Sequence, residues 1–312
     1  MKNNPGKKVI LSIDIGGSKL MAGLVDLNGK VIIKEKRNIE TKATSELLTQ
    51  NIIEMTDDLL KTKDVEIIYA GAAVPGLTDN KEGVLLYAPF SGIRDYKIGD
   101  LLKKKLGVEV FVENDANACA YGEMVFGTCK GIDDFIWITL SNGIGGALVL
   151  NGMIYKGCRG GAGEIGHIRV EQDGYECGCG NIGCLEAQAA GPGIVRRFNE
   201  KTGEPDKGLT ARDIAELAYK GDMAAIEIYR ETGLYLGKAI SYAVNLINPA
   251  KIVIGGGIAQ SSGLFMPWVK DYVRTSIIAD PNVDMIIEET ALGYDASLIG
   301  AAAVAKLGIG GK

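Results

Sequence analysis

One histidine and three cysteines lie close together near the middle of the chain. His167 is the only histidine among the 312 residues, and Cys177, Cys179 and Cys184 follow it with nine, one and four residues between successive positions. One imidazole and three thiolates complete a tetrahedral shell around Zn2+ and leave no position open for water. Glycines fill the gaps between the cysteines, where the backbone must turn around the ion. The spacing therefore predicts a structural zinc site rather than a catalytic one.

Two carboxylates stand beside the predicted zinc ligands. Glu164 precedes His167 by three residues, and Glu186 follows Cys184 by two. Because a closed zinc shell would fix the neighbouring backbone, both acids would be held in place. This arrangement predicts a polar binding site next to the metal.

Disulfide bonds are the alternative interpretation of these cysteines. The N-terminal residues contain no apolar signal segment, so we expect a cytoplasmic, reducing location in which disulfides are rare. Cys119, Cys129 and Cys158 lie apart from the cluster and are expected to be inert thiols.

Length and charge narrow the class of protein. A chain of 312 residues exceeds the usual size of a single core, which predicts two domains. The net charge is −5, and no basic cluster is longer than residues 103–105, so nucleic acid is not expected as a partner. No apolar stretch approaches the ~20 residues of a membrane span, and the alanine-rich stretch 296–305 predicts a buried helix. We therefore expect a soluble globular protein with no membrane partner.

Glycines concentrate at the ends of predicted strands. The strand 9–15 is followed by the glycine turn 16–19, a second strand 20–26 and the turn Asn28-Gly29. The same order recurs in strand 135–140, turn 141–146, strand 147–150 and turn Asn151-Gly152. Asn-Gly between apolar strands is a strong hairpin signal. The repetition predicts two similar halves, each of which begins with a glycine-tipped hairpin.

Such a pair of hairpins suits a nucleotide. Backbone N–H groups at a glycine turn can bind phosphate oxygens, and Asp14 beside the first turn could hold Mg2+ through water. Neither a GxxxxGK[ST] loop nor a GxGxxG motif opening a helix is present. The alternative is that both hairpins are simple turns, and the presence of two of them together with the acid favours the nucleotide.

Asn114 and Asp115 follow the apolar strand that begins at Val110. Ligands of open α/β sheets bind at the carboxyl ends of strands, so this pair is well placed for chemistry. An aspartate there could take the proton of an attacking hydroxyl in phosphoryl transfer. The alternative is that the pair caps a helix starting near Ala116. Both roles can coexist.

A third glycine cluster ends the strand 251–254. Gly255, Gly256 and Gly257 would allow a flat ring to approach the backbone, which favours an adenine site, and a tight turn without a ligand is the alternative. Apolar spacing predicts helices over 210–219, 224–245 and 264–275. Arg196 and Arg197 are expected on a solvated helix face.

Taken together, these motifs resemble the ROK group (repressors, open reading frames and sugar kinases) of the actin-like ATPase superfold. The resemblance covers nearly the whole chain and is carried by DIGGSK at 14–19, PG at 75–76, ENDANACAYGE at 113–123, NGIGGALVLNG at 142–152, GGAGEIGH at 160–167, CGCGNIGCLE at 177–186 and IGGG at 254–257.

The fold expected from this resemblance is a two-domain α/β fold of the actin-like ATPase (ribonuclease H-like) type, with an interdomain cleft and a structural zinc loop. We place the first domain at 1–118, completed by a C-terminal helix at 297–312. The second domain, at 119–296, would carry the zinc loop and a dimer surface, since the resemblance implies a homodimer.

The resemblance also implies ATP-dependent phosphorylation of a hexose, with glucose to glucose 6-phosphate as the first candidate. It makes Asp115 the catalytic base and implies ATP, Mg2+ and structural Zn2+ as cofactors. The sugar hydroxyls would be held by Asn114, Glu164, His167 and Glu186. The nucleotide and Mg2+ would be held by Asp14, Gly16, Gly17, Ser18, Lys19, Gly143, Gly145, Gly146, Gly255, Gly256 and Gly257.

The chain departs from the family pattern in three places. Ser18 replaces a threonine and keeps the hydroxyl, whereas Ser141-Asn142 replaces Gly-Thr and loses one. The segment 88–94 lacks the usual Asn-Leu and Trp, which leaves N-acetylmannosamine, N-acetylglucosamine, allose and fructose open as substrates. A non-catalytic sugar sensor is one alternative. A DNA-binding repressor is another, disfavoured because only about eight residues precede the first strand.

Overall fold

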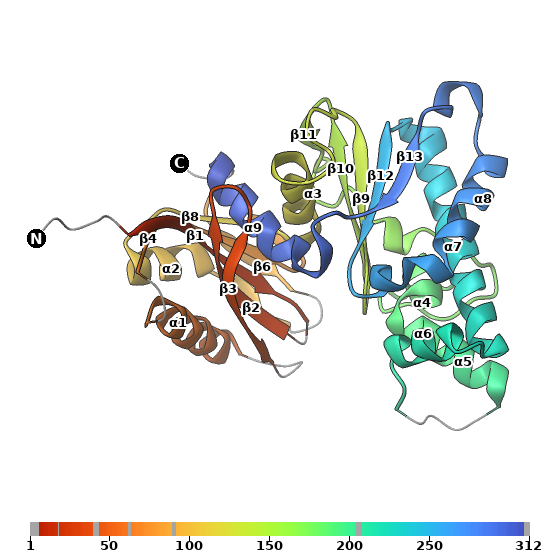
Figure 1. Ribbon diagram of the computed structural model, residues 1–312, viewed down its shortest axis with the longest axis horizontal. Helices are drawn as coiled ribbons and strands as arrows, with labels where there is room; N and C mark the ends of the chain where they lie inside the picture. The colour runs from red at the N-terminus through yellow and green to blue at the C-terminus, as the bar shows by residue number, and fades with distance from the viewer. Residues whose placement is uncertain are drawn as a thin grey trace, which may run out of the picture. The chain divides into compact units, whose positions relative to one another are not determined.

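The computed structural model describes residues 6–17, 19–39, 44–61, 64–88, 92–203 and 208–308. The chain divides into two units (Figure 1). Unit 1 comprises Met1–Gly131, Gly157–Gly161 and Asp295–Lys312, and unit 2 comprises Ile132–Lys156 and Ala162–Tyr294. The boundary that we placed at residue 118 falls inside helix α3 (Asp115–Val125), which the structure keeps whole in unit 1 because it packs on the C-terminal helix α9 (Ala296–Leu307).

Unit 1 is built on a five-stranded sheet in the order β3-β2-β1-β4-β8. Its antiparallel part consists of β1 (Lys7–Ile15), β2 (Lys19–Asp26) and β3 (Val31–Asn38). Its parallel part adds β4 (Val65–Val74) and β8 (Val110–Asn114) to β1. A small second sheet contains β5 (Leu77–Asp79), β6 (Val84–Tyr87) and β7 (Arg94–Tyr96).

Helices cover the main sheet of unit 1. Helices α1 (Ser45–Lys61) and α2 (Ile98–Leu106) contribute the apolar residues that form one core with the strands. Helix α9 packs against β4 at Gly71, where a Cβ atom would lie only 1.9 Å from the carbonyl oxygen of Ala301. It also packs against α3 at Gly300, where a Cβ would lie 2.3 Å from the Ala118 oxygen. These two glycines let α9 approach closely enough to bring its N-terminus to the end of β1.

Unit 2 repeats the strand order of unit 1. Its sheet runs β11-β10-β9-β12-β13, with β9 (Phe135–Leu140), β10 (Ile144–Leu150) and β11 (Met153–Ile154) antiparallel. Strands β12 (Lys251–Gly255) and β13 (Ile286–Glu289) follow in parallel. Both predicted glycine-tipped hairpins and the repetition between the halves are therefore confirmed.

One face of the unit 2 sheet is covered by helices (Figure 1). They are the short α4 (Leu185–Ala189), α5 (Gly191–Thr202), α6 (Ala211–Tyr219), α7 (Met223–Ile247) and α8 (Met266–Ser276), with the 3-10 turns Ile165–His167, Ile258–Leu264 and Asp280–Asn282. A last 3-10 turn, Gly293–Asp295, leads into α9. The helices predicted from apolar spacing are present, including the buried C-terminal one. Within the described ranges, no helix has both the length and the apolar character of a membrane span.

Candidate functional site

The carboxyl ends of three parallel strands bring the predicted acids of unit 1 to one edge of the sheet. In the register of β1, β4 and β8, Asp14 pairs with Ala73, and Ala73 pairs with Glu113. Neighbouring strands lie about 4.8 Å apart, so Asp14 and the end of β8 are separated by about two strand spacings. Asn114 and Asp115 come directly after Glu113, and the sheet therefore presents Asp14 and Asp115 along the same edge.

Asp14 is partly buried and is held by the first turn of α9. The hydroxyl of Ser297 donates to Asp14 Oδ1 at 2.7 Å. Desolvation raises the pKa of Asp14 to about 6, an effect that the Ser297 hydrogen bond opposes and the charge of Asp295 reinforces. A carboxylate whose charged form is destabilised in this way would be strongly stabilised by a bound cation.

Asn114 caps helix α3 as the alternative interpretation predicted. Its Oδ1 accepts from the backbone N–H of Asn117 at 3.1 Å, and its Nδ2 donates to the carbonyl oxygen of Gly76 at 3.1 Å. Asp115 is the first residue of the helix, and its Oδ1 accepts from the Ala116 N–H at 2.9 Å. This bond holds the Asp115 carboxylate in orientation at the N-terminus of α3.

A buried carboxylate that the sequence analysis missed supports this pair. Glu113 is fully buried, and its Oε1 accepts from the Asn114 N–H at 2.9 Å and from Asn117 Nδ2 at 3.1 Å. Its Oε2 accepts from Asn80 Nδ2. Glu113 thus fixes the backbone that carries Asn114 and Asp115. The only sequence signal was an acid at the end of an otherwise apolar strand.

Cys119, expected to be an inert thiol, is buried in this region on α3. Burial raises the pKa of its thiol well above the ordinary value, and the charges of Asp115, Asp14 and Glu123 add to the rise. The Cys119 thiol is therefore neutral at physiological pH.

Among the described residues, a backbone bond closes the first glycine turn. The N–H of Gly16 donates to the carbonyl oxygen of Lys19 at 2.8 Å, and Gly17 lies in the bend between them. Ser18, predicted to contact phosphate, lies outside the described residues.

In unit 2 the structure brings the four predicted zinc ligands together. One ligand atom from each of His167, Cys177, Cys179 and Cys184 lies within 4.8 Å of all the others. The Cys177 Sγ lies 3.6 Å from His167 Nδ1, and the sulfurs of Cys179 and Cys184 lie 3.7 Å apart. The donor set and its spacing fit a single Zn2+ ion.

The thiols of the cluster differ in acidity. A hydrogen bond from the backbone N–H of Asn181 lowers the pKa of Cys179 to about 7, whereas desolvation raises that of Cys184 to about 12. A cation bound among them would favour the thiolate at each cysteine.

Both carboxylates beside the cluster face it. His167 Nε2 lies 3.9 Å from Glu164 Oε2, so the imidazole directs Nδ1 toward the cysteines and Nε2 toward this acid. Glu186 Oε1 lies 3.9 Å from the Cys177 sulfur, and its Oε2 accepts from the Ile144 N–H at 2.9 Å. The Glu186 side chain therefore joins the Cys/His cluster to the second glycine turn.

The glycines of this second turn make different packing contacts. Gly143 lies beside Glu186, whose Oε2 would be 2.7 Å from an added Cβ. Gly145 and Gly146 lie within β10 and pair with Thr139 and Ile138. Gly146 also packs against the backbone of Gly163, whose oxygen would lie 2.7 Å from a Cβ, and so supports the chain just before Glu164.

The third glycine cluster packs against the second. Gly256 has φ +100°, and a Cβ there would lie 2.4 Å from the carbonyl oxygen of Leu140. A Cβ at Gly255 would meet the ring of Trp137 at 2.3 Å, and one at Gly257 would lie 3.7 Å from Ser141 Oγ. The three glycines allow the end of β12 to lie directly beside the end of β9.

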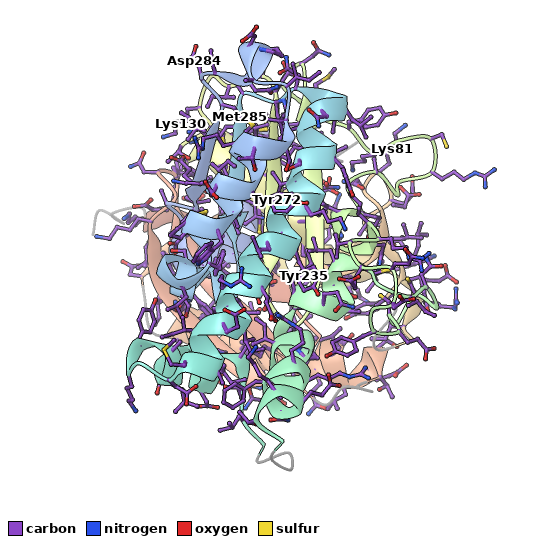
Figure 2. The ribbon with its side chains drawn as sticks, turned by 90° about the vertical axis from the view of Figure 1, so that its right-hand side faces the viewer. Lys81, Lys130, Tyr235, Tyr272, Asp284 and Met285 are labelled. Carbon is purple, nitrogen blue, oxygen red and sulfur yellow. The ribbon has the colours of Figure 1, made fainter. Side chains whose placement is uncertain are left out.

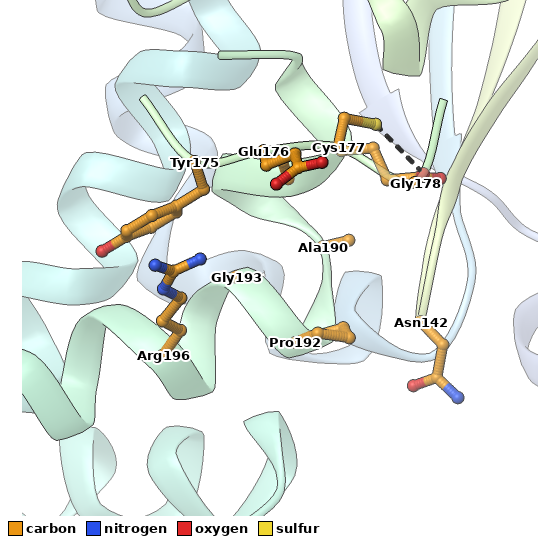
Figure 3. Close-up of a pocket in the computed structure, with 11 residues that line it drawn as sticks. Asn142, Tyr175, Glu176, Cys177, Gly178, Ala190, Pro192, Gly193 and Arg196 are labelled. Atoms are coloured by element: carbon orange, nitrogen blue, oxygen red, sulfur yellow. Dashed lines mark hydrogen bonds between the residues drawn. The ribbon is translucent and has the colours of Figure 1, made fainter. Parts of the chain in front are cut away.

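A pocket of about 240 Å³ lies beside the Cys/His cluster (Figure 3). Glu186, Cys177 and Asn142 line one part of it, and Tyr175 and Arg196 line another. The Arg196 guanidinium lies 3.8 Å from the centre of the Tyr175 ring. The rest of the lining is small, being Gly178, Ala187, Ala190, Pro192 and Gly193, with Glu176 as a further acid. The pocket opens a space next to Glu186 that small polar molecules can enter.

Arg197 corrects one expectation from the sequence. It is 7% exposed and bonds α4 and α7 instead of facing solvent, whereas the Arg196 side chain is 54% exposed. The signal was available, because residue 197 lies three positions after the buried Ile194 and next to the buried Phe198 on the inner face of α5.

Comparison with known proteins gives the family. The ROK family pattern matches residues 10–307. This chain belongs to the ROK family. A glucokinase of Streptomyces coelicolor is 32% identical, with 95% of this chain and 97% of that protein covered. A xylose repressor of Bacillus subtilis is 29% identical over 94% of this chain and 76% of its own length.

The fold of this ROK protein agrees with solved structures. The crystal structure of a ROK family glucokinase from Streptomyces griseus in complex with glucose and AMPPNP matches with a TM-score of 0.86 and 30% identity, covering 96% of this chain and 99% of that one. The actin-like ATPase fold predicted from the sequence is therefore confirmed.

Proposed function

We propose that this ROK protein is an ATP-dependent hexose kinase, with glucose as the first candidate acceptor. The observation that carries the proposal is the placement of Asp14 and Asp115 on one sheet edge, each held by a defined partner. Phosphoryl transfer to a hydroxyl needs one carboxylate to attract a cation and another to accept a proton. The relatives that are glucokinases support the same activity.

Asp115 is the proposed general base. As the sugar hydroxyl attacks, its proton passes to the Asp115 carboxylate, which must be ionised to receive it. The Ala116 N–H holds Oδ1 at the N-terminus of α3. Asn114 remains fixed by its bonds to Gly76 and Asn117, so the base and its neighbour keep a constant geometry. We assign Asn114 to a sugar hydroxyl through the second N–H of its amide.

The sugar-binding groups in unit 2 are proposed to be Glu164, His167 and Glu186. If zinc is held through His167 Nδ1, the Nε2 atom faces Glu164 and remains available for a hydroxyl. Glu186 is directed by the Ile144 N–H and lines the pocket. Paired donors and acceptors of this kind distinguish sugars by their hydroxyl pattern.

The nucleotide is assigned to the glycine turns and to Asp14. The turn at Gly16, Gly17, Ser18 and Lys19 and the turn at Gly143 would offer backbone N–H groups to the phosphates, with Gly145 and Gly146 supporting the second turn. Bound Mg2+ would neutralise phosphate charge. Asp14 is the acid on this edge whose raised pKa indicates that a bound cation would stabilise its charged form. Gly255, Gly256 and Gly257 are assigned to the adenosine.

A homodimer and a cytoplasmic location stay predictions.

A second candidate is a sugar-binding regulator without kinase activity. The relationship to a xylose repressor favours it, and so does Ser141-Asn142 at the second turn, where the family pattern has a threonine hydroxyl.

Sugar-dependent ATP consumption separates the two candidates. We expect turnover in the presence of Mg2+ with one member of a panel containing glucose, fructose, allose, N-acetylglucosamine and N-acetylmannosamine. Calorimetry on the same panel measures binding independently of turnover. Binding of a sugar without turnover on any of them would reject the kinase and favour the regulator.

A further inference from the structure

Arg197 is a buried charge that the proposed chemistry does not use. Its guanidinium donates through Nη1 to Glu231 Oε2 at 2.8 Å and through Nη2 to Thr232 Oγ1 at 2.5 Å, both on α7. The Cζ atom also lies 5.5 Å from the centre of the Tyr235 ring. Tyr235 belongs to the same helix and is labelled in Figure 2. Desolvation lowers the pKa of Arg197 and the Glu231 charge opposes this, so the guanidinium stays protonated.

The remaining bonds of Arg197 go to backbone oxygens. Nε donates to the Gln188 oxygen at 3.0 Å, and Nη1 also donates to the Ile228 oxygen at 3.3 Å. Gln188 belongs to α4, which is only five residues long. A helix of this length is not stable alone, and its last carbonyls need partners from outside. Arg197 supplies one of these partners and ties α4 to α7.

The position of α4 matters because it determines where a metal ligand and a proposed sugar-binding acid lie. Cys184 is its N-cap residue and Glu186 lies in its first turn. The segment on the other side of the metal cluster is also tied to α7, since Lys238 Nζ donates to the Val170 oxygen at 2.6 Å and the Tyr235 hydroxyl donates to Glu171 at 3.3 Å. Helix α7 therefore anchors both sides of the zinc loop, 168–184.

We propose that Arg197 is a positioning residue that, by fixing α4 on α7, sets the places of Cys184 for zinc and of Glu186 for the sugar. The second half of this inference rests on the proposed function. The first half concerns zinc retention and does not. An uncharged side chain at 197 would leave the Gln188 carbonyl and the Glu231 carboxylate without this partner and would loosen the end of the loop.

The test compares Arg197→Met and Arg197→Lys with the matched control Arg212→Met, which removes an exposed arginine on α6 that lies outside the pocket and the zinc loop. Zinc release into a chromophoric chelator, KM for the sugar, KM for ATP and kcat are measured on each folded, zinc-loaded protein. We expect Arg197→Met to release zinc about tenfold faster and to raise KM for the sugar about tenfold, with KM for ATP little changed. Arg197→Lys should recover part of both effects, because one ammonium keeps the charge beside Glu231 but cannot make all four bonds. Arg212→Met should change neither.

Thermal unfolding separates positioning from general stability. A lower melting temperature in Arg197→Met with unchanged zinc release and an unchanged KM for the sugar would overturn the proposal. If Arg197→Met does not fold, the Arg197→Lys comparison decides, and zinc release equal to that of the unmodified protein would count against the proposal. A protein that shows no kinase activity but faster zinc release in Arg197→Met would reject the proposed function while supporting the zinc half of this inference.

Discussion

The ionised Asp14 side chain lowers the stability of the fold, although the proposed function requires it. Its carboxylate is partly desolvated against α9, and only the Ser297 hydroxyl among its described contacts compensates for the charge. Ionised Asp14 therefore costs folding free energy in the absence of a cation. A bound cation would offset this cost, which supports the assignment of Asp14 to the nucleotide and Mg2+.

Replacement of Asp14 by asparagine should stabilise the ligand-free protein at neutral pH. The folded-state pKa of about 6 lies above the ordinary value of 3.8, so the folded state loses stability as pH rises from about 4 to about 6. Above pH 6 the loss is complete. We expect Asp14→Asn to be more stable by about 1–2 kcal/mol at pH 7.5, with the difference vanishing near pH 4. Urea unfolding at several pH values, without Mg2+ and nucleotide, measures this.

Asp26 offers a control of opposite sign. Desolvation raises its pKa, but hydrogen bonds from the backbone of Lys30 and Asn28 and from the Lys7 side chain outweigh this and lower it. Asp26→Asn should therefore destabilise the protein at neutral pH, with the difference shrinking as pH falls below about 4. If Asp14→Asn were destabilising at every pH, the assigned desolvation of Asp14 would be wrong.

At the scale of elements, the zinc loop is a connection that has little regular structure of its own. Its described contacts include short turns, two isolated bridges and the anchors to α5 and α7. Such a segment depends on cross-links for its conformation, and a metal bound to His167 and to the three cysteines of the loop would supply them. Glu164 and Glu186 flank the loop and depend on it for their orientation.

Removal of zinc should weaken sugar binding much more than nucleotide binding. The proposed sugar-binding residues His167 and Glu186 contact the cluster, whereas the glycine turn of β1 and β2 belongs to unit 1. Calorimetry of the chelated protein with the sugar and with a non-hydrolysable ATP analogue tests this, and restoring zinc should recover the lost affinity. Retention of sugar affinity after complete chelation would show that the loop does not need the metal.

At the scale of the whole molecule, the local patterns were enough to predict most elements. Asn-Gly turns and alternating apolar residues located both hairpins. The two units share one strand order, and the sequence indicated this because the same succession of strands and glycine turns occurs twice. The meeting of His167 with the three cysteines was also predictable, since 18 residues contain all four.

Contacts between distant segments were not predictable in this way. Ser297 reaches Asp14 across 283 positions because Gly71 and Gly300 let α9 pack closely, and no local pattern encodes that approach. Helical spacing on α5 indicated that Arg197 faces inward, but its partners lie on α7, about 35 residues away, and no local pattern identifies them. The network around Glu113 and Asn80 was missed for the same reason.

The central claim is that Asp115 acts in the chemical step, and one comparison tests it most directly. Once the sugar is known, kcat and the sugar Kd are measured for the unmodified protein, Asp115→Asn and the matched control Asp100→Asn, which alters an exposed carboxylate on α2. We predict that Asp115→Asn lowers kcat by about 10²–10⁴ while the Kd changes less than about twofold, and that Asp100→Asn changes neither. A kcat in Asp115→Asn close to that of the unmodified protein, or a loss confined to sugar affinity, would contradict the assignment of Asp115 as the base.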